Sequence, residues 1–332
     1  MDSETFKGSA RQRLKQARAL VEAGAFDQAH ELILSLQSDP GVTGSESRES
    51  VGDLGSRTML DLPRKLHSLK LRLAKAQGNR LERIGLQYML VPPPELLGPL
   101  TRFTSTERQA ITLRNREPVP RILHQIWLGP LPVPPATERW REHAARHGLE
   151  YRLWREADLD QLRARDHPVF AHMLAVDDYP GAVDVARYAI LAEIGGIYLD
   201  CDWYPARDDL SFADLLPLIG LAALAEDTPR DTGLGSLLLT NSLIAAPPRH
   251  PVFERLLAIL PEVIELLPEG PAWWSTGPLV MTLLFRGTTF TVPDAAIVAS
   301  TLARHAPFTE VEAVRGNAIA RDLGLLIGWK SW

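Results

Sequence analysis

Two carboxylates separated by one residue follow a short apolar segment in the middle of the chain. Residues 197–202 are Ile-Tyr-Leu-Asp-Cys-Asp, so Asp200 and Asp202 stand at the end of a predicted strand. Because alternate residues of a strand point the same way, these carboxylates are expected to share a face. Two like charges so close repel unless a cation neutralises them or one takes up a proton. Oxygen ligands suit a hard divalent metal, which can bridge them to a diphosphate. The pair therefore predicts a metal site that handles a phosphorylated donor.

The segment before this strand predicts a helix. Apolar residues recur at helical spacing up to residue 194, and Gly195 and Gly196 end the pattern. Asp184 and Arg187 are three positions apart and so lie on one helix face. Exposed pairs of this kind are common and contribute roughly 0.3–0.5 kcal/mol. Their position just before a strand tipped with carboxylates favours a functional face instead.

Read together, residues 184–202 resemble the sugar-binding region, containing the DXD motif, of a glycosyltransferase family. That family includes yeast initiating mannosyltransferases, bacterial capsule enzymes and the clostridial glucosylating toxins. Four further segments are similar to the family and occur in the expected order within residues 118–332: residues 120–129, 241–246, 275–278 and 331–332.

One departure from the family pattern lies near the end of the chain. Relatives often carry a histidine shortly before the terminal Ser-Trp, whereas this chain ends Gly-Trp-Lys-Ser-Trp. Either Trp329 or Lys330 replaces part of that closure, or the outer coordination of the metal differs.

The resemblance implies the roles of the site residues. Asp202 is the firmer metal ligand, and Asp200 ligates directly or through water and also contacts ribose or sugar. Arg187 binds sugar hydroxyls with Asp184 and lies near the diphosphate; we expect it to be catalytic together with the two DXD aspartates. Manganese or magnesium is the expected cofactor. The expected donor-binding set is Trp127, Leu128, Asp184, Arg187, Tyr198, Asp200, Asn241, Ser331 and Trp332.

Several of these residues also have a purely structural interpretation. Trp127, expected by analogy to stack on the nucleotide base, is about equally often a core residue at such a position. Tyr198, expected to share the face of the two aspartates, would be equally unsurprising in the core. Asn241 is costly within an apolar strand unless it is hydrogen-bonded or functional, and the resemblance makes it a sugar or acceptor ligand. Ser331 and Trp332 would form a lid whose order depends on donor binding.

The elements that must position these residues form two regions. Residues 1–117 are predicted to be helical, with helices over 9–37 joined at Gly24, a mobile loop near 38–58, and a helix over 62–86 with a candidate break at Gly78. Strand–helix alternation then begins. It predicts strands at 122–128, 150–154, 196–200 and 237–245 and helices at 135–147, 182–194 and 251–267.

Such alternation predicts an α/β fold with a mostly parallel central sheet. In sheets of this kind ligands collect at the carboxyl ends of the strands, where the DXD pair would stand. The resemblance makes residues 118–332 a GT-A type glycosyltransferase domain, preceded by the helical N-terminal region.

Composition limits the alternatives. The chain has 332 residues, is 45% hydrophobic and 23% charged, and carries a net charge of −5, which is typical of a soluble globular protein. No basic patch interleaved with aromatic residues favours nucleic acid. No run approaches the roughly 20 apolar residues of a membrane span, and the N-terminus lacks the layout of a secretory signal. Cys201 is the single cysteine, so no intrachain disulfide is expected. Cytoplasmic localisation is the expectation.

The expected function is a metal-dependent glycosyltransferase that moves a hexose from a nucleotide-sugar to a saccharide, lipid-linked or protein acceptor. A UDP-sugar is favoured over GDP-mannose as the donor. The resemblance also implies retention of the anomeric configuration. One alternative is a phosphohydrolase of the haloacid-dehalogenase type, which also uses a strand followed by Asp-x-Asp. That family normally has Thr or Val two positions after the second aspartate, where this chain has Tyr204. The other alternative is a non-catalytic binding protein with a vestigial transferase domain.

Overall fold

The structure is a computed structural model that describes residues 9–43, 54–58, 60–90, 96–162, 164–226, 238–268 and 270–332. The described residues form two compact units, the first within residues 9–90 and the second from residue 96 to residue 226 and from residue 238 to residue 332. The second unit thus includes residues 96–117, which the sequence analysis placed in the helical region. The domain boundary between 117 and 118 stays a prediction. Residues 44–53, in the middle of the predicted mobile loop, lie outside the described residues.

The first unit is helical. It consists of α1 (Ala10–Glu22), α2 (Phe26–Gln37), the short α3 (Pro40–Thr43), α4 (Arg64–Ala76) and α5 (Arg80–Leu90). A capping box starts α1, where Ser9 and Gln12 satisfy each other's backbone N–H groups. Buried aliphatic side chains of α1, α2 and α4 form its core. The α4–α5 pair is a second helical hairpin that the sequence pattern did not distinguish.

The predicted helix over 62–86 is two helices rather than one. Gly78 adopts a φ of 68°, which ends α4 and lets the chain reverse into α5. This is the break that the sequence offered as a candidate.

The second unit is built on a five-stranded sheet in the order β2-β1-β3-β6-β5. Strands β1 and β2, and β1 and β3, pair in parallel, whereas β6 runs antiparallel to both of its neighbours, so four strands share one direction. This confirms the predicted α/β fold with a mostly parallel sheet. The strands are β1 (Ile122–Ile126), β2 (Glu150–Trp154), β3 (Gly196–Leu199), β5 (Ala222–Ala225) and β6 (Leu239–Ala246).

A smaller sheet has the order β4-β8-β7, formed by β4 (Trp203–Pro205), β8 (Leu326–Gly328) and β7 (Val298–Thr301). It joins the end of the chain to the segment just after the DXD pair, because β8 pairs antiparallel with β4. The sequence analysis did not predict this sheet, since each strand is only three or four residues long.

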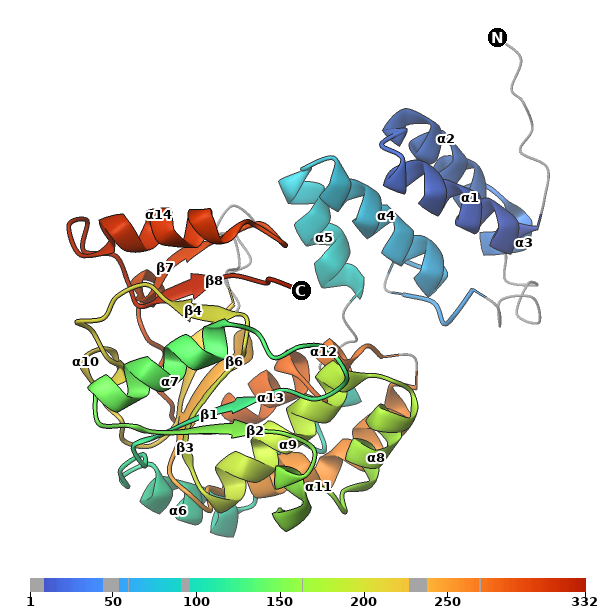
Figure 1. Cartoon of the computed structure of the whole chain (residues 1–332). Helices are drawn as coiled ribbons and strands as arrows, with labels where there is room; N and C mark the ends of the chain where they lie inside the picture. The colour runs from blue at the N-terminus through green and yellow to red at the C-terminus, as the bar shows by residue number, and fades with distance from the viewer. Residues whose placement is uncertain are drawn as a thin grey trace. The chain divides into compact units, whose positions relative to one another are not determined.

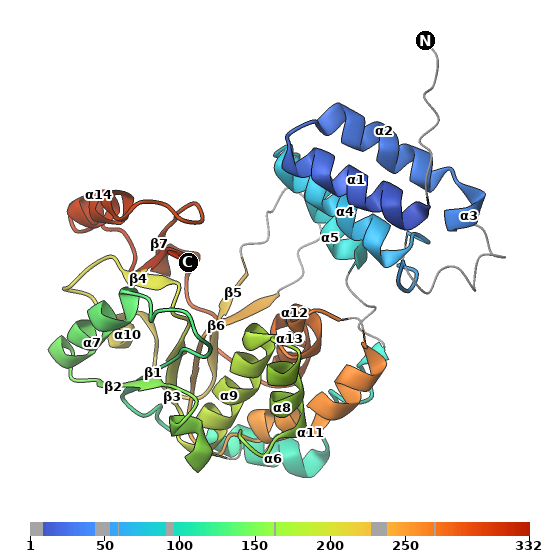
Figure 2. The ribbon, with the colours of Figure 1, turned by 45° about the vertical axis from the view of Figure 1, so that its right-hand side comes forward.

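Helices cover both faces of the larger sheet (Figures 1 and 2). One face packs against α9 (Tyr179–Glu193) and α13 (Pro278–Phe285), with α11 (Pro251–Leu266) beyond them. The other face packs against α7 (Ala136–Arg146) and α10 (Phe212–Leu215), whose Trp140 and Phe212 are fully buried in its core. The remaining helices of the unit are α6 (Ser105–Arg114), the 3-10 turn Asp158–Gln161, α8 (Pro168–Ala175), α12 (Ala272–Ser275), the 3-10 turn Ala295–Ile297 and α14 (Phe308–Ala318).

The strand directions bring distant parts of the sequence to one edge of the sheet. Parallel strands β1 and β3 both end there, at Ile126 and Leu199, and the antiparallel β6 begins there at Leu239. Ligands gather at this carboxyl edge in α/β folds. It carries the residues that follow β1, the DXD residues and the start of β6.

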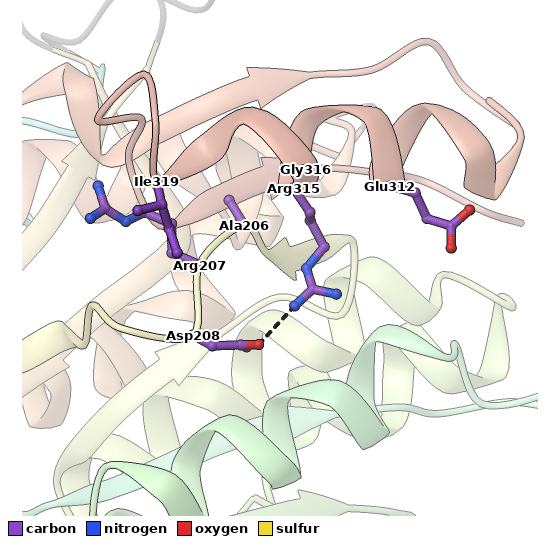
Figure 3. Close-up of a pocket in the computed structure, with 7 residues that line it drawn as sticks. All are labelled: Ala206, Arg207, Asp208, Glu312, Arg315, Gly316 and Ile319. Atoms are coloured by element: carbon purple, nitrogen blue, oxygen red, sulfur yellow. Dashed lines mark hydrogen bonds and ion pairs between the residues drawn. The ribbon is translucent and has the colours of Figure 1, made fainter.

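A shallow hollow of about 370 Å³ lies beyond the far end of β4, against α14 (Figure 3). Its charges are largely paired internally: Arg315 bonds to Asp208 at 3.1 Å, and Arg207 pairs with Asp209 and Asp322. It shares no residue with the predicted site. Its lining is formed by Ala206, Arg207, Asp208, Glu312, Arg315, Gly316 and Ile319.

Candidate active site

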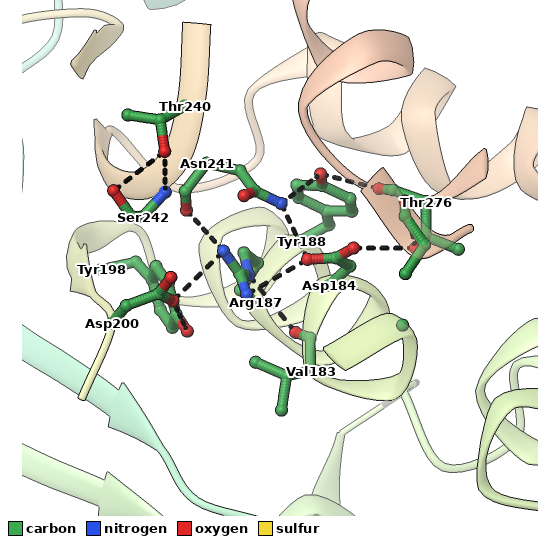
Figure 4. Close-up of polar contacts among 12 residues, drawn as sticks. Val183, Asp184, Arg187, Tyr188, Tyr198, Asp200, Thr240, Asn241, Ser242 and Thr276 are labelled. Carbon is green, nitrogen blue, oxygen red and sulfur yellow. Dashed lines mark hydrogen bonds and ion pairs between the residues drawn. The ribbon is translucent and has the colours of Figure 1, made fainter. Parts of the chain in front are cut away.

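Arg187 is the centre of a buried polar network at the carboxyl edge of the sheet (Figure 4). Its guanidinium lies 3.1 Å from Asp184 Oδ1 and 3.3 Å from Asp200 Oδ1, and it donates to the backbone carbonyl of Asn241 at 2.6 Å. It also lies over the Tyr198 ring, 4.5 Å from the centroid. Burial alone would lower the pKa of Arg187, but the neighbouring Asp200, Tyr198 and Asp184 raise it above its ordinary value. A permanent positive charge is therefore fixed here.

Asp184 is held from three directions. It accepts hydrogen bonds from the Asn241 side-chain amide and the Thr276 hydroxyl, both at 2.7 Å, in addition to its ion pair with Arg187. Burial raises its pKa to about 6, against the opposing effect of Arg187. The carboxylate is thus ionised at neutral pH but desolvated, and its orientation is fixed. Asn241 is hydrogen-bonded, as an amide in an apolar strand must be.

Two residues of this network were given no role by the sequence analysis. Thr276 donates to Asp184, and Tyr188 donates to the Thr276 backbone carbonyl at 2.8 Å and lies 3.3 Å from the Asn241 amide. Tyr188 stands four positions after Asp184 on α9, so helical spacing alone placed both on one face. Thr276 belongs to a segment that resembles the family, but its contact with Asp184 depends on tertiary packing.

The two DXD aspartates lie in a turn beyond the strand, so strand alternation does not set the direction of Asp202. Strand β3 ends at Leu199, and the chain turns through residues 200–202 before β4 begins at Trp203. The turn is fixed because the Asp200 backbone N–H donates to Ser242 and the Cys201 thiol donates to the Ile126 carbonyl. Tyr198 and Asp200, which are two positions apart, do lie on the same side of the chain, because the Tyr198 hydroxyl donates to Asp200 Oδ1 at 2.7 Å.

Asp202 differs from Asp200 in having no partner. No hydrogen bond or ion pair joins its carboxylate to another residue in the described part of the chain, whereas Asp200 is bonded to Tyr198 and Arg187. Burial, followed by the charge of Asp200, raises the pKa of Asp202 to about 6, and Lys330 opposes the rise. A half-buried carboxylate without a partner suits a cation.

The donor set has the chemistry that a hard divalent metal requires, because Asp202 and Asp200 offer carboxylate oxygens. Within the described residues, no group of three His, Cys, Asp or Glu side chains is placed to hold a metal ion together. The protein would therefore supply only part of the coordination. The rest would come from water or from a ligand such as a diphosphate, as in sites that hold magnesium with one or two carboxylates.

The predicted residues at the two ends of the catalytic region meet beside this turn. Trp127 follows β1, is 8% exposed, and donates its indole N–H to the Leu131 carbonyl at 2.9 Å. Its ring meets the ring of Trp332 edge-on, with the centroids 4.7 Å apart. Leu128 is buried and Ser331 is half-buried. The structure therefore brings Trp127 and Trp332 together, and separately joins Asp184, Arg187, Tyr198, Asp200 and Asn241.

His124 and His250 make structural contacts. His124 bonds to the Gly195 carbonyl through one ring nitrogen and to the Trp154 indole through the other, and burial lowers its pKa to about 4. His250 caps the start of α11 and contacts Asn115. Neither histidine bonds to a residue of the predicted site.

The buried network and the DXD turn lie together at the carboxyl edge of an α/β sheet, where ligands gather in folds of this kind. Residues 136–214, from α7 to α10, match the family described as "Glycosyltransferase sugar-binding region containing DXD motif". The match confirms the resemblance of this region to that family.

Curated proteins are similar to this chain over about half of its length. Mannosyl phosphorylinositol ceramide synthase SUR1 of Saccharomyces cerevisiae is 26% identical over 176 residues, which are 51% of this chain and 42% of that protein. Inositol phosphoceramide mannosyltransferase 3 of Schizosaccharomyces pombe is 28% identical over 178 residues, which are 50% and 45% of the two chains. The chain thus spans less than half the length of these relatives.

A solved structure, the PaToxG glycosyltransferase, superposes with a TM-score of 0.40 at 16% identity, over 58% of this chain and 77% of that one. Within the described residues, no helix has both the length and the apolar character needed to cross a bilayer.

Proposed function

We propose that the protein is a metal-dependent glycosyltransferase that uses a nucleotide-sugar donor. The observation that supports this most is the buried network in which Arg187 joins Asp184, Asp200 and Asn241 next to the unpartnered carboxylate of Asp202. A buried charged network is often no more stable than apolar packing of the same volume, so its presence at this edge favours a role in binding over one in stability. The names of the relatives, a mannosyl phosphorylinositol ceramide synthase and an inositol phosphoceramide mannosyltransferase, support a glycosyltransferase.

Each residue has a part in the proposed reaction. Asp184 and Asn241 orient sugar hydroxyls, and Arg187 fixes both carboxylates in place. Asp202 and Asp200 would hold the divalent ion, which supplies Lewis-acid stabilisation to the leaving diphosphate. Trp127 and Trp332 form an aromatic pair beside the turn, where a nucleotide base would pack.

We propose retention of configuration by front-face displacement. The bond between the anomeric carbon and the diphosphate oxygen breaks with its electron pair on that oxygen. The acceptor hydroxyl forms the new bond on the same face, and its proton passes to the departing phosphate.

The choice of donor is best tested first with GDP-mannose alongside UDP-glucose, UDP-galactose and UDP-N-acetylglucosamine. One relative is named a mannosyltransferase and the other a mannosyl phosphorylinositol ceramide synthase, whereas the expectation from the sequence was a UDP-sugar. A lipid-linked acceptor becomes the first acceptor to try for the same reason, with saccharides and proteins next.

A thermal-shift screen of these donors with manganese or magnesium tests the proposal. We expect one donor to raise the melting temperature only with metal present, and Asp202→Asn to abolish the shift. Absence of any shift with every donor and either metal would contradict it. The phosphohydrolase alternative predicts rapid metal-dependent release of phosphate from a generic phosphate ester, and a binding-only protein predicts donor binding without hydrolysis or transfer.

A further inference from the structure

Lys330 is fixed next to the DXD turn by its backbone neighbours. The Trp329 backbone N–H donates to the Asp202 carbonyl at 2.7 Å, and the Trp329 indole donates to Ala306 at 2.8 Å. The Lys330 carbonyl itself accepts from the His305 N–H at 2.9 Å. The chain on both sides of the Lys330 side chain is therefore anchored, and its Cα cannot drift away from the turn.

The ammonium group of Lys330 is exposed and uncommitted. It lies 5.5 Å from the centroid of the Trp332 ring, and no described residue forms an ion pair with it. Arg187, another cation at this edge, is buried and already engaged by Asp184, Asp200 and the Asn241 carbonyl. Lys330 has none of these commitments.

Lys330 and Asp202 lie at the same turn without forming an ion pair. The hydrogen bond from the Trp329 N–H to the Asp202 carbonyl holds Lys330, the next residue, beside this turn, yet no ion pair of 4 Å or less joins the Lys330 ammonium to the Asp202 carboxylate in the described structure. The Lys330 ammonium and the Asp202 carboxylate are opposite charges at one turn that do not pair with each other, so a single ligand could bind both. A diphosphate does so, because some of its oxygens can share a cation with Asp202 while others accept from an ammonium group.

We propose that Lys330 binds the diphosphate of the nucleotide donor, opposite the carboxylate of Asp202. This inference rests on the proposed function. Lys330 contributes a positive charge to the leaving diphosphate in addition to that of the metal. A compact ammonium with three donors is suited to phosphate as a point charge.

Calorimetric titration with four nucleotides, UDP, GDP, UMP and GMP, in the presence of manganese tests the assignment. Lys330→Met should weaken binding of the preferred diphosphate by about tenfold, the loss of one charge-assisted contact. The matching monophosphate should bind the variant within twofold of the wild type. Lys330→Arg should restore most of the affinity for the diphosphate. When a chelator removes the manganese, the wild type should keep a residual affinity for the diphosphate that Lys330→Met lacks.

Arg321→Met is the matched control, since Arg321 is exposed on the same unit, on the segment between α14 and β8. An equal loss in Lys330→Met and Arg321→Met would mean general electrostatic attraction and would overturn the assignment. Unchanged diphosphate binding in Lys330→Met and Lys330→Gln, with the wild type binding normally, would overturn it while leaving the proposed function intact. If the wild type binds none of the four nucleotides, the proposed function is overturned instead. Lys330 is exposed, so melting curves of its variants should match the wild type.

Discussion

Arg187 approaches Asp184 to 3.1 Å across one turn of α9, and neither side chain is more than 7% exposed. On a helix surface such a pair would contribute only a few tenths of a kcal/mol. Here water is excluded, and each charge depends on the other and on the hydrogen bonds around it. Breaking a buried pair by removing one partner leaves an uncompensated charge, which typically costs about 3–5 kcal/mol. This burial is what turns a common sequence spacing into a rigid recognition element.

Arg187→Met should lower the free energy of unfolding by about 3–5 kcal/mol, because it leaves the carboxylate of Asp184 buried without its counter-charge. Chemical denaturation at pH 7 measures this loss. Arg141→Met is the control: Arg141 forms an exposed ion pair with Glu138, so its removal should cost less than about 1 kcal/mol. Equal small losses in both variants would contradict the importance of the buried pair.

Thr276→Val tests the hydrogen bond that the sequence did not reveal. The change keeps the shape of the side chain but removes the hydroxyl that donates to Asp184 at 2.7 Å. Leaving a buried carboxylate short of one donor should cost about 1–3 kcal/mol in unfolding free energy. Thr112→Val removes an exposed hydroxyl that bonds only to the Arg108 carbonyl, and it should stay within about 0.5 kcal/mol of the wild type. A loss no larger than that of the control would show that Asp184 does not need this donor.

Asp202 should give the metal-free protein a specific pH dependence. Its pKa is raised from 3.8 to about 6 by burial and by Asp200, so the folded protein holds this proton more tightly than the unfolded chain. Stability from this group is therefore present below pH 4 and declines as pH rises to about 6. With a chelator present, the free energy of unfolding of Asp202→Asn should rise by about 1–2 kcal/mol relative to that of the wild type as the pH increases across that interval. This figure takes 1.36 kcal/mol per pKa unit and is reduced because the side chain is partly exposed. Parallel stability curves for the two proteins between pH 4 and 7 would show that the carboxylate is not desolvated.

Gly196 occupies a position that only glycine fits. Its φ is 105°, and a Cβ there would lie 2.8 Å from both the Ile122 carbonyl and the His124 ring. Gly196→Ala should therefore destabilise the fold by about 2–4 kcal/mol and disturb the strand that leads to the DXD turn. Gly316→Ala, in helix α14 with no neighbour within 4 Å, should be neutral or stabilising by up to about 1 kcal/mol. Thermal melts of the two variants make the comparison, and similar melting temperatures would refute the close contact at Gly196.

Local patterns in the sequence were sufficient for four of the five strands of the larger sheet and for helices α7, α9 and α11, but not for β5 or for the other helices of the second unit. The helix of residues 182–194 and the strands near residues 122, 150, 196 and 239 follow from periodicity and from glycine stops, which act over a few residues. The small sheet was missed because its strands are short and pair the chain end with the segment after the DXD motif. Such pairing depends on contacts more than 100 residues apart along the chain.

The sequence by itself determined the residue types of the site, the order of its elements and the α/β class, because these depend on composition and on spacing within single helices and strands. Tertiary structure alone decided which aspartate is engaged and which is unpartnered, that Thr276 supports Asp184, and that Trp332 meets Trp127. The physical reason is that burial and desolvation are properties of the assembled sheet edge. Local sequence patterns do not predict the solvent exposure of each carboxylate.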